Sequence, residues 1–500
     1  MRQLLVFLSF ILMLSASAQG LKISRGPYLQ IATQSSIIIR WNTNELANAI
    51  VNVGYEPHQL NMTFKDLNES SEVHEVQITG LTENTQYFYE VISVNTAQHK
   101  VKSEINFFKT LPLKGTDDKY SFLVLGDCGS GRPEQMEVKN MMISYFGGSH
   151  FDGVLLLGDN AYEKGTDQNY QDNFFKYDEI FANTVIWPTP GNHEYNNHIP
   201  FSKKPAYYDI FNCPKNAEAG GVASGSEKYY SYDIGNIHFV SLDSYDEKSK
   251  LNSKMANWLI SDLKTNTLEW TVVYFHHPPY SKGTHNSDNP NGIDRELSKM
   301  RKRIVPILET YNVDLVLNGH SHSYERSYLL KGHYGKSKTL NEEHFVDHTS
   351  GSYPKSCPYQ KNASDTSKSN GTVYCVMGCS GKNAHLKKDR HHPVMHSYDF
   401  EQYGAIILTI EANQLSSEFV TSNGKVFDTF TIVKNAGQKV EVEVEYKTLP
   451  DLKKSWKNMT VWTNDGVEFN TMPPYLTQDC IIRTSDPMNC IEDVFMIKIK

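Results

Sequence analysis

Five short polar motifs in the middle of the chain each follow a run of apolar residues. The runs are rich in Val, Leu and Ile, as buried strands of a layered sheet are, and they span residues 120–125, 153–157, 185–189, 270–275 and 313–317. The motifs that follow them are Gly126-Asp127-Cys128-Gly129, Gly158-Asp159-Asn160-Ala161-Tyr162, Gly191-Asn192-His193-Glu194, His276-His277-Pro278-Pro279-Tyr280 and Gly319-His320-Ser321-His322. Because ligands collect outside the carboxyl ends of strands in such sheets, we expect the five motifs to converge on one site.

Helical patterns lie between these strands, over residues 133–146, 170–181, 254–264 and 295–311. The alternation of strand and helix predicts a layered α/β domain. Residues 229–243 have the pattern of a hairpin turning at Gly235-Asn236. Residues 331–371 are polar and poor in hydrophobic side chains, which predicts a long surface excursion.

The two ends of the chain have a different pattern from the middle. Residues 21–112 contain short alternating strands with Trp41 and late tyrosines, which predicts a small β-sandwich. Gly80 to Tyr87 resembles the corner before a late strand of a fibronectin type III domain. Residues 435–500 include the alternating segment Val440 to Glu445 and predict a small β-rich region of unknown role.

The first 18 residues have the composition of a secretory signal peptide. Arg2 precedes an apolar stretch from Leu4 to Leu14, and Ser15 to Ala18 supplies the small residues of a cleavage site. A membrane anchor is the alternative, but the apolar stretch is too short to span a bilayer. No later segment of the sequence is apolar enough to predict a transmembrane helix, so we expect a secreted, extracellular or periplasmic protein.

The charge and the cysteines limit the class of protein further. A formal net charge of −8 argues against a protein that wraps nucleic acid. Seven cysteines in an exported chain make disulfides reasonable. Cys480 and Cys490 are close in sequence and are the pair that we expect to form a disulfide. A bond from Cys357 to Cys375 or Cys379 is a weaker alternative.

The motifs together offer seven side chains with nitrogen or oxygen donors: Asp127, Asp159, Tyr162, Asn192, His276, His320 and His322. These are too many for one tetrahedral zinc ion and too rich in nitrogen for calcium. Two metal ions bridged by a carboxylate explain them better, and such a pair polarises phosphoryl oxygens. Cys128 lies among hard-metal ligands, so we expect it to be a small buried residue instead of a ligand.

Tyr162 narrows the choice of metal. A free phenol has a pKa near 10, so it binds as phenolate only to a strong Lewis acid such as ferric iron. Such an ion also deprotonates bound water at acidic pH, and metal-bound hydroxide would then be the nucleophile. The alternative for Tyr162 is a packed core tyrosine.

The motifs in this order resemble those of the purple acid phosphatases, with Val273 to His276 supplying a further Val-x-x-His element. Ser323 to Arg326 and Arg25 to Gln30 resemble the larger, two-domain members, and the resemblance covers residues 21–434. It implies an α+β or α/β fold class. A fibronectin type III-like sandwich at 21–112 would precede a four-layer αββα metallophosphoesterase domain at 118–434 with two mixed β-sheets.

The resemblance also implies a role for each donor. Asp127, Tyr162 and His322 would bind Fe(III), Asn192, His276 and His320 would bind a divalent iron, zinc or manganese ion, and Asp159 would bridge the two. His193 and His285 would bind phosphate and protonate the leaving group, in an order that the pattern does not give, and Asn192 would also face substrate. For the remaining candidates we expect a structural role for His277, a place at the mouth of the site for Tyr280, and positions away from it for His391, His392 and His396.

The predicted function is therefore a secreted acid phosphatase that hydrolyses small phosphate monoesters. A phosphodiesterase or nucleotidase of the same metallophosphoesterase class is the alternative, which Tyr162 disfavours. A non-catalytic surface-binding protein would be signalled by missing ligands, and none of the seven is missing. The sequence does not specify the physiological substrate, the divalent metal or the oligomeric state.

Overall fold

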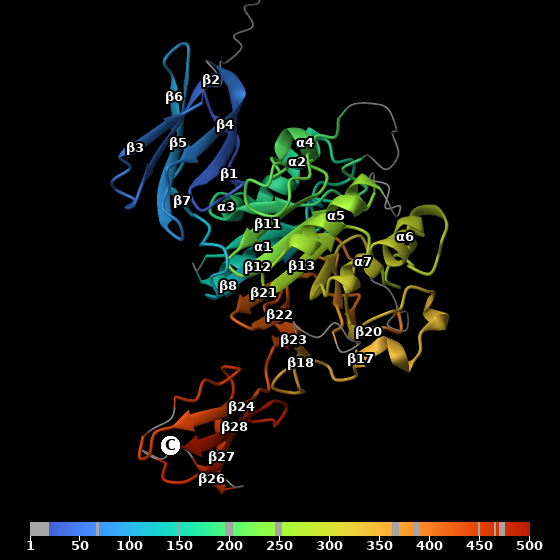
Figure 1. Ribbon diagram of the computed structural model, residues 1–500. Helices are drawn as coiled ribbons and strands as arrows, with labels where there is room; N and C mark the ends of the chain where they lie inside the picture. Colours follow the sequence, from blue (N-terminus) through green and yellow to red (C-terminus); the bar gives the residue numbers. More distant parts are fainter. Residues whose placement is uncertain are drawn as a thin grey trace, which may run out of the picture.

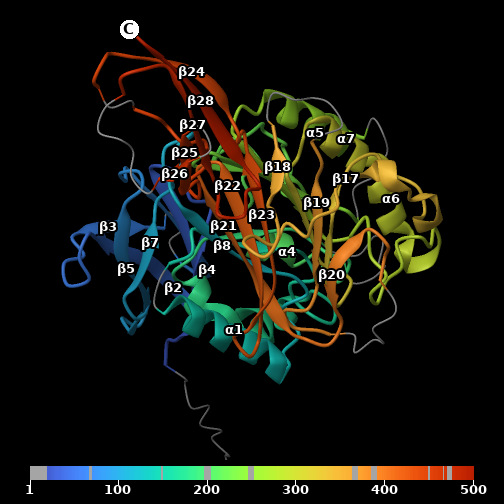
Figure 2. The same ribbon diagram turned by 90° about the horizontal axis from the view of Figure 1, so that it is seen from below.

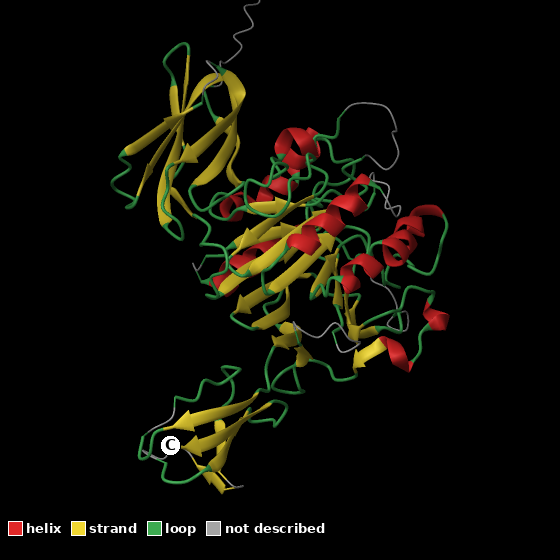
Figure 3. Cartoon of the chain, in the orientation of Figure 1, coloured by secondary structure: helices red, strands yellow, loops and turns green. Residues whose placement is uncertain are grey.

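The computed structural model describes residues 20–66, 70–147, 150–195, 204–245, 253–362, 370–383, 391–448, 451–464, 467–469 and 476–500. The signal peptide predicted at residues 1–18 lies outside these ranges. Among the helices formed by the described residues, none has the length and apolar character needed to cross a membrane. Figure 3 shows that helices occur in the middle of the chain, whereas its first and last parts are built from strands and loops.

The N-terminal part is an all-β sandwich, as predicted. Its strands are β1 (Ile23–Gln30), β2 (Ser36–Gly54), β3 (Met62–Lys65), β4 (Ser71–Thr79), β5 (Gln86–Asn95), β6 (Lys100–Lys102) and β7 (Asn106–Lys109). The first half of the long β2 pairs with β1 and β4, and its second half pairs with β3 and β5. At the corner before β5, the backbone N–H of Thr82 donates to the Tyr87 hydroxyl at 2.9 Å, which fixes the turn.

The first strand of the sandwich docks onto the middle of the chain. The Arg25 guanidinium binds Asp167 at 2.8 Å. The Tyr28 hydroxyl donates to the carbonyl of Ile210 at 3.1 Å, and Arg40 of the neighbouring β2 donates to the same carbonyl at 2.8 Å. The segment Arg25 to Gln30 therefore attaches the sandwich to the domain that carries the five motifs.

Two seven-stranded mixed sheets form the body of that domain (Figure 1). The first has the order β10 (Ile186–Pro188), β9 (Gly153–Leu156), β8 (Tyr120–Leu125), β21 (Gly404–Glu411), β22 (Gln414–Thr421), β23 (Val426–Lys434) and β18 (Tyr359–Lys361). The second has the order β11 (Tyr230–Ile234), β12 (Ile237–Leu242), β13 (Trp270–Phe275), β14 (Leu315–Asn318), β19 (Val373–Met377), β15 (Tyr324–Ser327) and β20 (Met395–Asp399). Their inner faces stack through aromatic pairs, with Phe122 and Phe239 at 4.8 Å and Tyr324 and Phe419 at 4.2 Å between ring centroids.

Helices cover both outer faces, which confirms the four-layer αββα arrangement. On one side, α1 (Pro133–Phe146) packs Val138 and Met142 against the first sheet. On the other side lie α5 (Lys254–Thr265), α6 (Arg295–Arg303) and α7 (Val305–Thr310), whose apolar side chains share a core with β12, β13 and β14. Figure 2 shows α1 on the opposite side of the stacked sheets from α5, α6 and α7.

The remaining short elements lie in the connections of this domain. They are α2 (Asp167–Asp172), η1 (Phe174–Tyr177), α3 (Asp178–Phe181), α4 (Tyr207–Ile210), η2 (Gly292–Asp294), β16 (Leu329–Leu330), η3 (Ser337–Thr339), η4 (Glu342–His344) and β17 (Phe345–Asp347).

Two helices predicted as continuous are broken. Residues 170–181 fall in three short helices, α2, η1 and α3. The break between α2 and η1 is at Asn173, whose side chain donates to the carbonyl of Tyr162 at 2.8 Å. Residues 295–311 divide into α6 and α7 beside Pro306, because proline has no N–H to continue the helix. The polar segment 331–371 also returns to the body twice, where β17 pairs with β16 and β18 extends the first sheet.

The last part of the chain forms a five-stranded sheet of its own. The strands are β24 (Lys439–Val444), β25 (Val461–Asn464), β26 (Val467–Phe469), β27 (Cys480–Ser485) and β28 (Glu492–Ile499), in the order β24-β28-β27-β25-β26. Val444, Ile482, Phe495 and Ile497 form a small core between them. Figure 1 shows this sheet beside the edge of the first sheet that ends in β18.

A disulfide joins this last sheet to the body of the protein. It links Cys357, before β18, to Cys490 in the turn before β28. The predicted Cys480–Cys490 pair is wrong because β27 runs away from Cys480 toward the turn that holds Cys490. A strand of that length spans about 20 Å, well beyond the reach of a disulfide.

Replacing Cys357 and Cys490 with serine is expected to release the last sheet from the body. Loss of a cross-link that closes a long loop should cost about 2 to 4 kcal/mol of unfolding free energy. Limited proteolysis should then remove residues after 435 faster than in the wild type. The matched control is Cys480→Ser, which lies outside this disulfide, and equal proteolysis rates in the double variant and this control would contradict the expectation.

A histidine of β12, the strand next to the edge of the second sheet, is buried between two carboxylates. His238 Nδ1 lies 2.7 Å from Asp233 Oδ1, and Nε2 lies 2.8 Å from Asp262 Oδ2. Both ring nitrogens must donate to satisfy these oxygens, so the imidazole is charged. Burial by itself would lower the pKa of His238, but the two carboxylates raise it to about 9.

The stability of the protein should depend on this charge. Because the folded-state pKa of His238 is raised, its contribution is complete below the unfolded pKa of about 6.5 and is lost as pH rises through about 9. Over that window we expect the unfolding free energy of the wild type to fall by about 3 kcal/mol relative to His238→Gln. Denaturant unfolding at several pH values measures this difference, and parallel curves for the two proteins would contradict it.

Candidate metal centre

The motif side chains do meet, at the carboxyl ends of strands from both sheets. Asp127 follows β8 and Asp159 follows β9, both in the first sheet. His276 follows β13 and His320 follows β14 in the second sheet. The site therefore lies where the ends of the two stacked sheets face each other, as the strand-end pattern predicts.

Three of these residues have an unusual backbone conformation. Asp127, Asp159 and His320 have φ of 55°, 49° and 68°, in the left-handed region that residues with a side chain seldom occupy. Their neighbours leave no room for relaxation: a Cβ on Gly158 would lie 2.7 Å from His276 Nδ1, and one on Gly319 would lie 2.6 Å from Asp127 Oδ2. Tight glycine-flanked turns thus bring the strand-end side chains together.

One group of donors surrounds the phenol of Tyr162, which is 1% exposed. Its oxygen lies 2.6 Å from Asp127 Oδ1, 3.1 Å from Asp159 Oδ2 and 3.3 Å from His322 Nε2. Asp127 also accepts the backbone N–H of His320 at 2.7 Å, which fixes the orientation of its carboxylate. A phenol, two carboxylates and an imidazole therefore face a common point.

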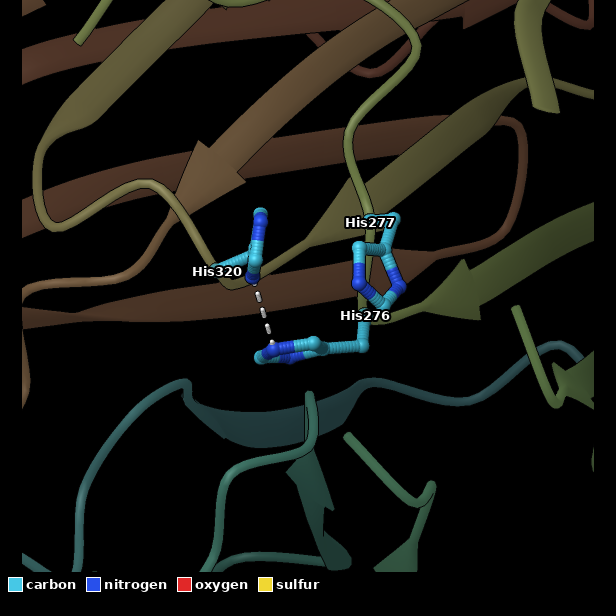
Figure 4. A group of neighbouring side chains, drawn as sticks. All are labelled: His276, His277 and His320. Atoms are coloured by element: carbon cyan, nitrogen blue, oxygen red, sulfur yellow. Dashed lines mark hydrogen bonds between the residues drawn. The ribbon is translucent and has the colours of Figure 1, made fainter. Parts of the chain in front are cut away.

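A second group surrounds His276. Its Nε2 lies 3.1 Å from Asn192 Oδ1, 3.3 Å from Asp159 Oδ2 and 3.3 Å from His320 Nδ1. Figure 4 shows the His276 and His320 rings pointing toward one another from their separate strand ends. Asp159 Oδ2 is common to both groups, so this oxygen stands between them.

The hydrogen bonding of His276 shows why a cation fits here. Its Nδ1 faces the carbonyl of Leu157 at 2.9 Å and must donate to it, so Nε2 of the neutral ring presents a lone pair to the oxygens of Asn192 and Asp159. Acceptors that converge without a proton between them need a positive charge. His320 Nε2 is also buried without a hydrogen-bond partner among the described residues. This donor set fits bound metal ions.

The same crowding shifts the pKa values of these side chains. Burial would lower the pKa of His276, but Asp159 raises it to about 9. Burial would raise the pKa of Asp159, yet the neighbouring His276 and His193 hold it well below its usual range. The oxygens around Nε2 of His276 thus favour a positive charge there, which either a proton or a bound metal ion would supply.

Two further imidazoles border these groups. The His193 backbone N–H donates to Asp159 Oδ1 at 2.9 Å, and its Nδ1 faces the carbonyl of Glu163 at 2.5 Å. His285 Nδ1 faces Asp294 Oδ1 at 2.9 Å, and its ring stacks on that of His320 at 3.8 Å. Each ring is held through Nδ1, which directs Nε2 away from its anchor, and each side chain is 16% exposed.

Some predicted positions lie elsewhere. The prediction for Tyr280 is wrong: it is 1% exposed, its hydroxyl donates to the carbonyl of His333, and its ring packs on Tyr374. The ring also lies beside His392 and under the Arg301 guanidinium, so Tyr280 is packed in the interior with its hydroxyl satisfied. Cys128 is fully buried, as expected, and burial raises the pKa of its thiol well above the usual range.

The four other histidines considered in the sequence, His277, His391, His392 and His396, lie outside the two donor groups. His277 bonds Ser244 Oγ through Nδ1 at 2.8 Å, and its ring lies 4.3 Å from that of His320, so it packs against that imidazole. The remaining three contact residues outside the two donor groups: His391 stacks on Tyr398, His392 packs on Tyr280, and His396 packs on Tyr328.

Two buried carboxylates that the sequence did not single out hold the site together. Glu194 accepts the backbone N–H groups of Gly191, Asp159 and Asn160 at 2.7, 2.9 and 2.8 Å, which ties the second and third motifs to each other. Its position in the Gly-Asn-His-Glu motif was the sequence signal that could have identified it. Glu325 accepts from Ser281 Oγ at 2.6 Å and Ser323 Oγ at 3.0 Å, and so joins the loop of His285 to the loop of His322.

Comparison with known proteins agrees with this geometry. The purple acid phosphatase N-terminal domain matches residues 25–110, and the calcineurin-like phosphoesterase family matches residues 120–324. The chain is 30% identical to purple acid phosphatase 21 of Arabidopsis thaliana over 60% of this chain and 65% of that protein. It is 30% identical to purple acid phosphatase 1 of Ipomoea batatas over 53% of this chain and 54% of that protein. The match thus spans less than two thirds of these relatives.

The fold also has solved counterparts. A purple acid phosphatase from yellow lupin seeds superimposes with a TM-score of 0.62 at 18% identity, over 82% of this chain and 75% of that one. PhoD superimposes with a TM-score of 0.55 at 15% identity, over 83% of this chain and 90% of that one. These likenesses concern the fold alone. The chain therefore has, in order, the N-terminal domain of the purple acid phosphatases and a calcineurin-like phosphoesterase domain whose motif residues gather at the strand ends.

Proposed function

We propose that this protein is an acid phosphatase that hydrolyses small phosphate monoesters at a centre of one Fe(III) and one divalent metal ion. The observation that carries the proposal is the position of Asp159 Oδ2, 3.1 Å from the Tyr162 oxygen and 3.3 Å from His276 Nε2. One carboxylate oxygen stands between a group that contains a phenol and a group that contains two imidazoles. That arrangement suits a ferric ion on one side and a divalent ion on the other.

The proposed ligands divide accordingly. Asp127, Tyr162 and His322 would hold Fe(III), Asn192, His276 and His320 would hold divalent iron, zinc or manganese, and Asp159 would bridge. When bound, the two ions would supply Lewis acidity to the phosphoryl oxygens and to water. Tyr162 would bind as the phenolate, and the Leu157 carbonyl keeps Nδ1 of His276 protonated so that Nε2 would be the atom that faces the metal.

His193 and His285 would handle the substrate. The Glu163 carbonyl holds Nδ1 of His193, and Asp294 holds Nδ1 of His285, so both rings are locked in orientation. Nε2 of each ring would bind a phosphate oxygen or donate a proton to the leaving alkoxide, and that of His193 lies 3.7 Å from Asp159 Oδ2, at the border of the proposed metal centre. The amide of Asn192 would contribute to substrate binding from the metal side.

Replacing Asp294 with asparagine tests the role of His285. Asparagine keeps the shape of the side chain but removes the carboxylate that anchors Nδ1 of His285, so the ring should be held less firmly and kcat should fall about 10- to 100-fold with metal content unchanged. The matched control is Asn289→Ala, which removes an exposed bond to the other oxygen of Asp294. A wild-type kcat in Asp294→Asn would contradict a role for His285 that depends on this anchor.

The proposal extends to the organisation and location of the chain. The chain would comprise a signal peptide at 1–18, the sandwich at 21–112, the catalytic domain at 118–434 and a C-terminal region at 435–500 with no assigned role. Export of the protein is supported by the composition of its N-terminus and by the Cys357–Cys490 disulfide, a bond that persists in oxidising compartments. Mass spectrometry of protein recovered from the medium or periplasm should show an N-terminus after Ala18.

A substrate screen separates this function from its alternatives. We expect phosphate monoesters to be hydrolysed in preference to diesters, with an optimum on the acidic side of a range from about pH 4 to about pH 8. Preference for diesters or for nucleotides would favour the phosphodiesterase or nucleotidase. No hydrolysis of any ester by protein that holds both metals would favour a binding protein.

A further inference from the structure

A lysine covers one face of the proposed ferric ligand Tyr162. Lys382 Nζ lies 3.5 Å from the centroid of the Tyr162 ring, close enough for a strong cation–π contact. The same nitrogen donates to Glu163 Oε1 at 2.8 Å. The lysine side chain is only 11% exposed, whereas that of Glu163 is 67% exposed. Water screens the carboxylate, so the aromatic face is the buried partner of this charge.

The loop that carries Lys382 is fixed against the loops of the metal ligands. It follows β19, and a Cβ on Gly378 would lie 2.0 Å from the carbonyl oxygen of Ser321, between the two histidines of the fifth motif. A Cβ on Gly381 would lie 2.3 Å from the carbonyl oxygen of Cys128. The Ser380 N–H donates to the carbonyl of Gly126 at 3.2 Å. Backbone packed this closely holds Lys382 in register with Tyr162.

Lys382 is the charged group over the face of the Tyr162 ring, and the other neighbour of the ring approaches its edge. His193 approaches the ring edge-on, with centroids 4.6 Å apart and planes at 62°. Glu163 serves both contacts, since its carbonyl holds His193 and its carboxylate holds Lys382. The pair Tyr162-Glu163 thus organises a ligand, a substrate-facing imidazole and a fixed positive charge.

We propose that Lys382 is a positioning residue that acts through Tyr162 by lowering the energy of the phenolate electrons. The inference rests on the proposed function, in which Tyr162 binds Fe(III). A positive charge above the ring stabilises electron density on the phenolate, so the phenolate donates less of it to the metal. Transfer of an electron from phenolate to Fe(III) by visible light then needs more energy than it would without the lysine.

The test is the visible spectrum of iron-loaded variants. Lys382→Gln and Lys382→Met both remove the charge, and methionine keeps an unbranched side chain against the ring. In both, the charge-transfer maximum should move to longer wavelength by on the order of ten nanometres. Lys382→Arg should keep the wild-type wavelength. The matched control is Lys102→Gln, a lysine on the N-terminal sandwich that pairs with Glu90 at 2.9 Å.

The outcomes separate this inference from the proposed function. Spectra are compared per bound iron, so a variant that loads less iron is still informative. An unshifted maximum in either neutral variant, or an equal shift in Lys102→Gln, would overturn the role of Lys382 and leave the ferric site intact. A wild-type protein that binds iron but has no visible band would instead overturn the assignment of Tyr162 to Fe(III), and the role of Lys382 with it.

Discussion

Asp159→Ala is expected to lose metal retention and turnover together. The Asp159 carboxylate is buried, and its Oδ2 is the oxygen common to the Tyr162 group and the His276 group. Without it, two cations would lie close together with no shared anion between them. Ester hydrolysis should fall by at least about 1,000-fold, and elemental analysis should find less than one metal ion per chain.

Two variants show whether the loss is specific. Asp159→Asn keeps the volume and an acceptor for the His193 N–H, so metal loss in this variant reports the missing charge and not a collapsed loop. Asp152→Ala removes a carboxylate at the opposite end of β9, where it accepts the N–H of Ser121 at 2.8 Å, and should keep both metals. Full activity and two bound metals in Asp159→Ala would contradict the bridged centre.

Tyr162→Phe is expected to bleach the protein. Phenylalanine retains the ring that packs against His193 and Lys382 and removes only the oxygen that lies 2.6 Å from Asp127. The phenolate is the proposed source of the visible charge-transfer band, so absorbance per bound iron should fall to the baseline. The measurement is the visible spectrum of protein with known iron content.

Another buried tyrosine provides the control for this variant. Tyr170 donates to Glu194 Oε1 at 3.2 Å and lies outside the donor groups, so Tyr170→Phe should stay coloured. A band of undiminished intensity in Tyr162→Phe would mean that a different residue is the chromophore. The ferric assignment of the first donor group would then fail.

The sequence predicted the core of the site because its signal is local. Asp127 and His276 each stand next to a recognisable apolar strand, and strand ends in layered sheets have one place to meet. The supports of the site have no such signal. Lys382 lies far along the chain from Tyr162, and Asp294 ends the short helix η2 nine residues after His285. Only the folded chain brings each to its partner.

The errors in the fold have the same origin. The helical pattern is interrupted at Asn173, whose side chain donates a hydrogen bond to the carbonyl of Tyr162. Local helix propensity does not encode this contact. Cys490 pairs with Cys357 across the boundary of the last sheet, whereas nearness in sequence favoured Cys480. Tertiary contacts therefore determine both features.

The most direct measurement of the proposed centre is the metal content of purified wild-type protein, read together with its colour and activity. We expect two metal ions per chain, one of them iron, in a violet or pink protein whose rate of phosphate monoester hydrolysis rises in proportion to iron occupancy. A colourless protein that is fully active with two zinc ions would contradict the ferric centre while leaving phosphoester hydrolysis intact.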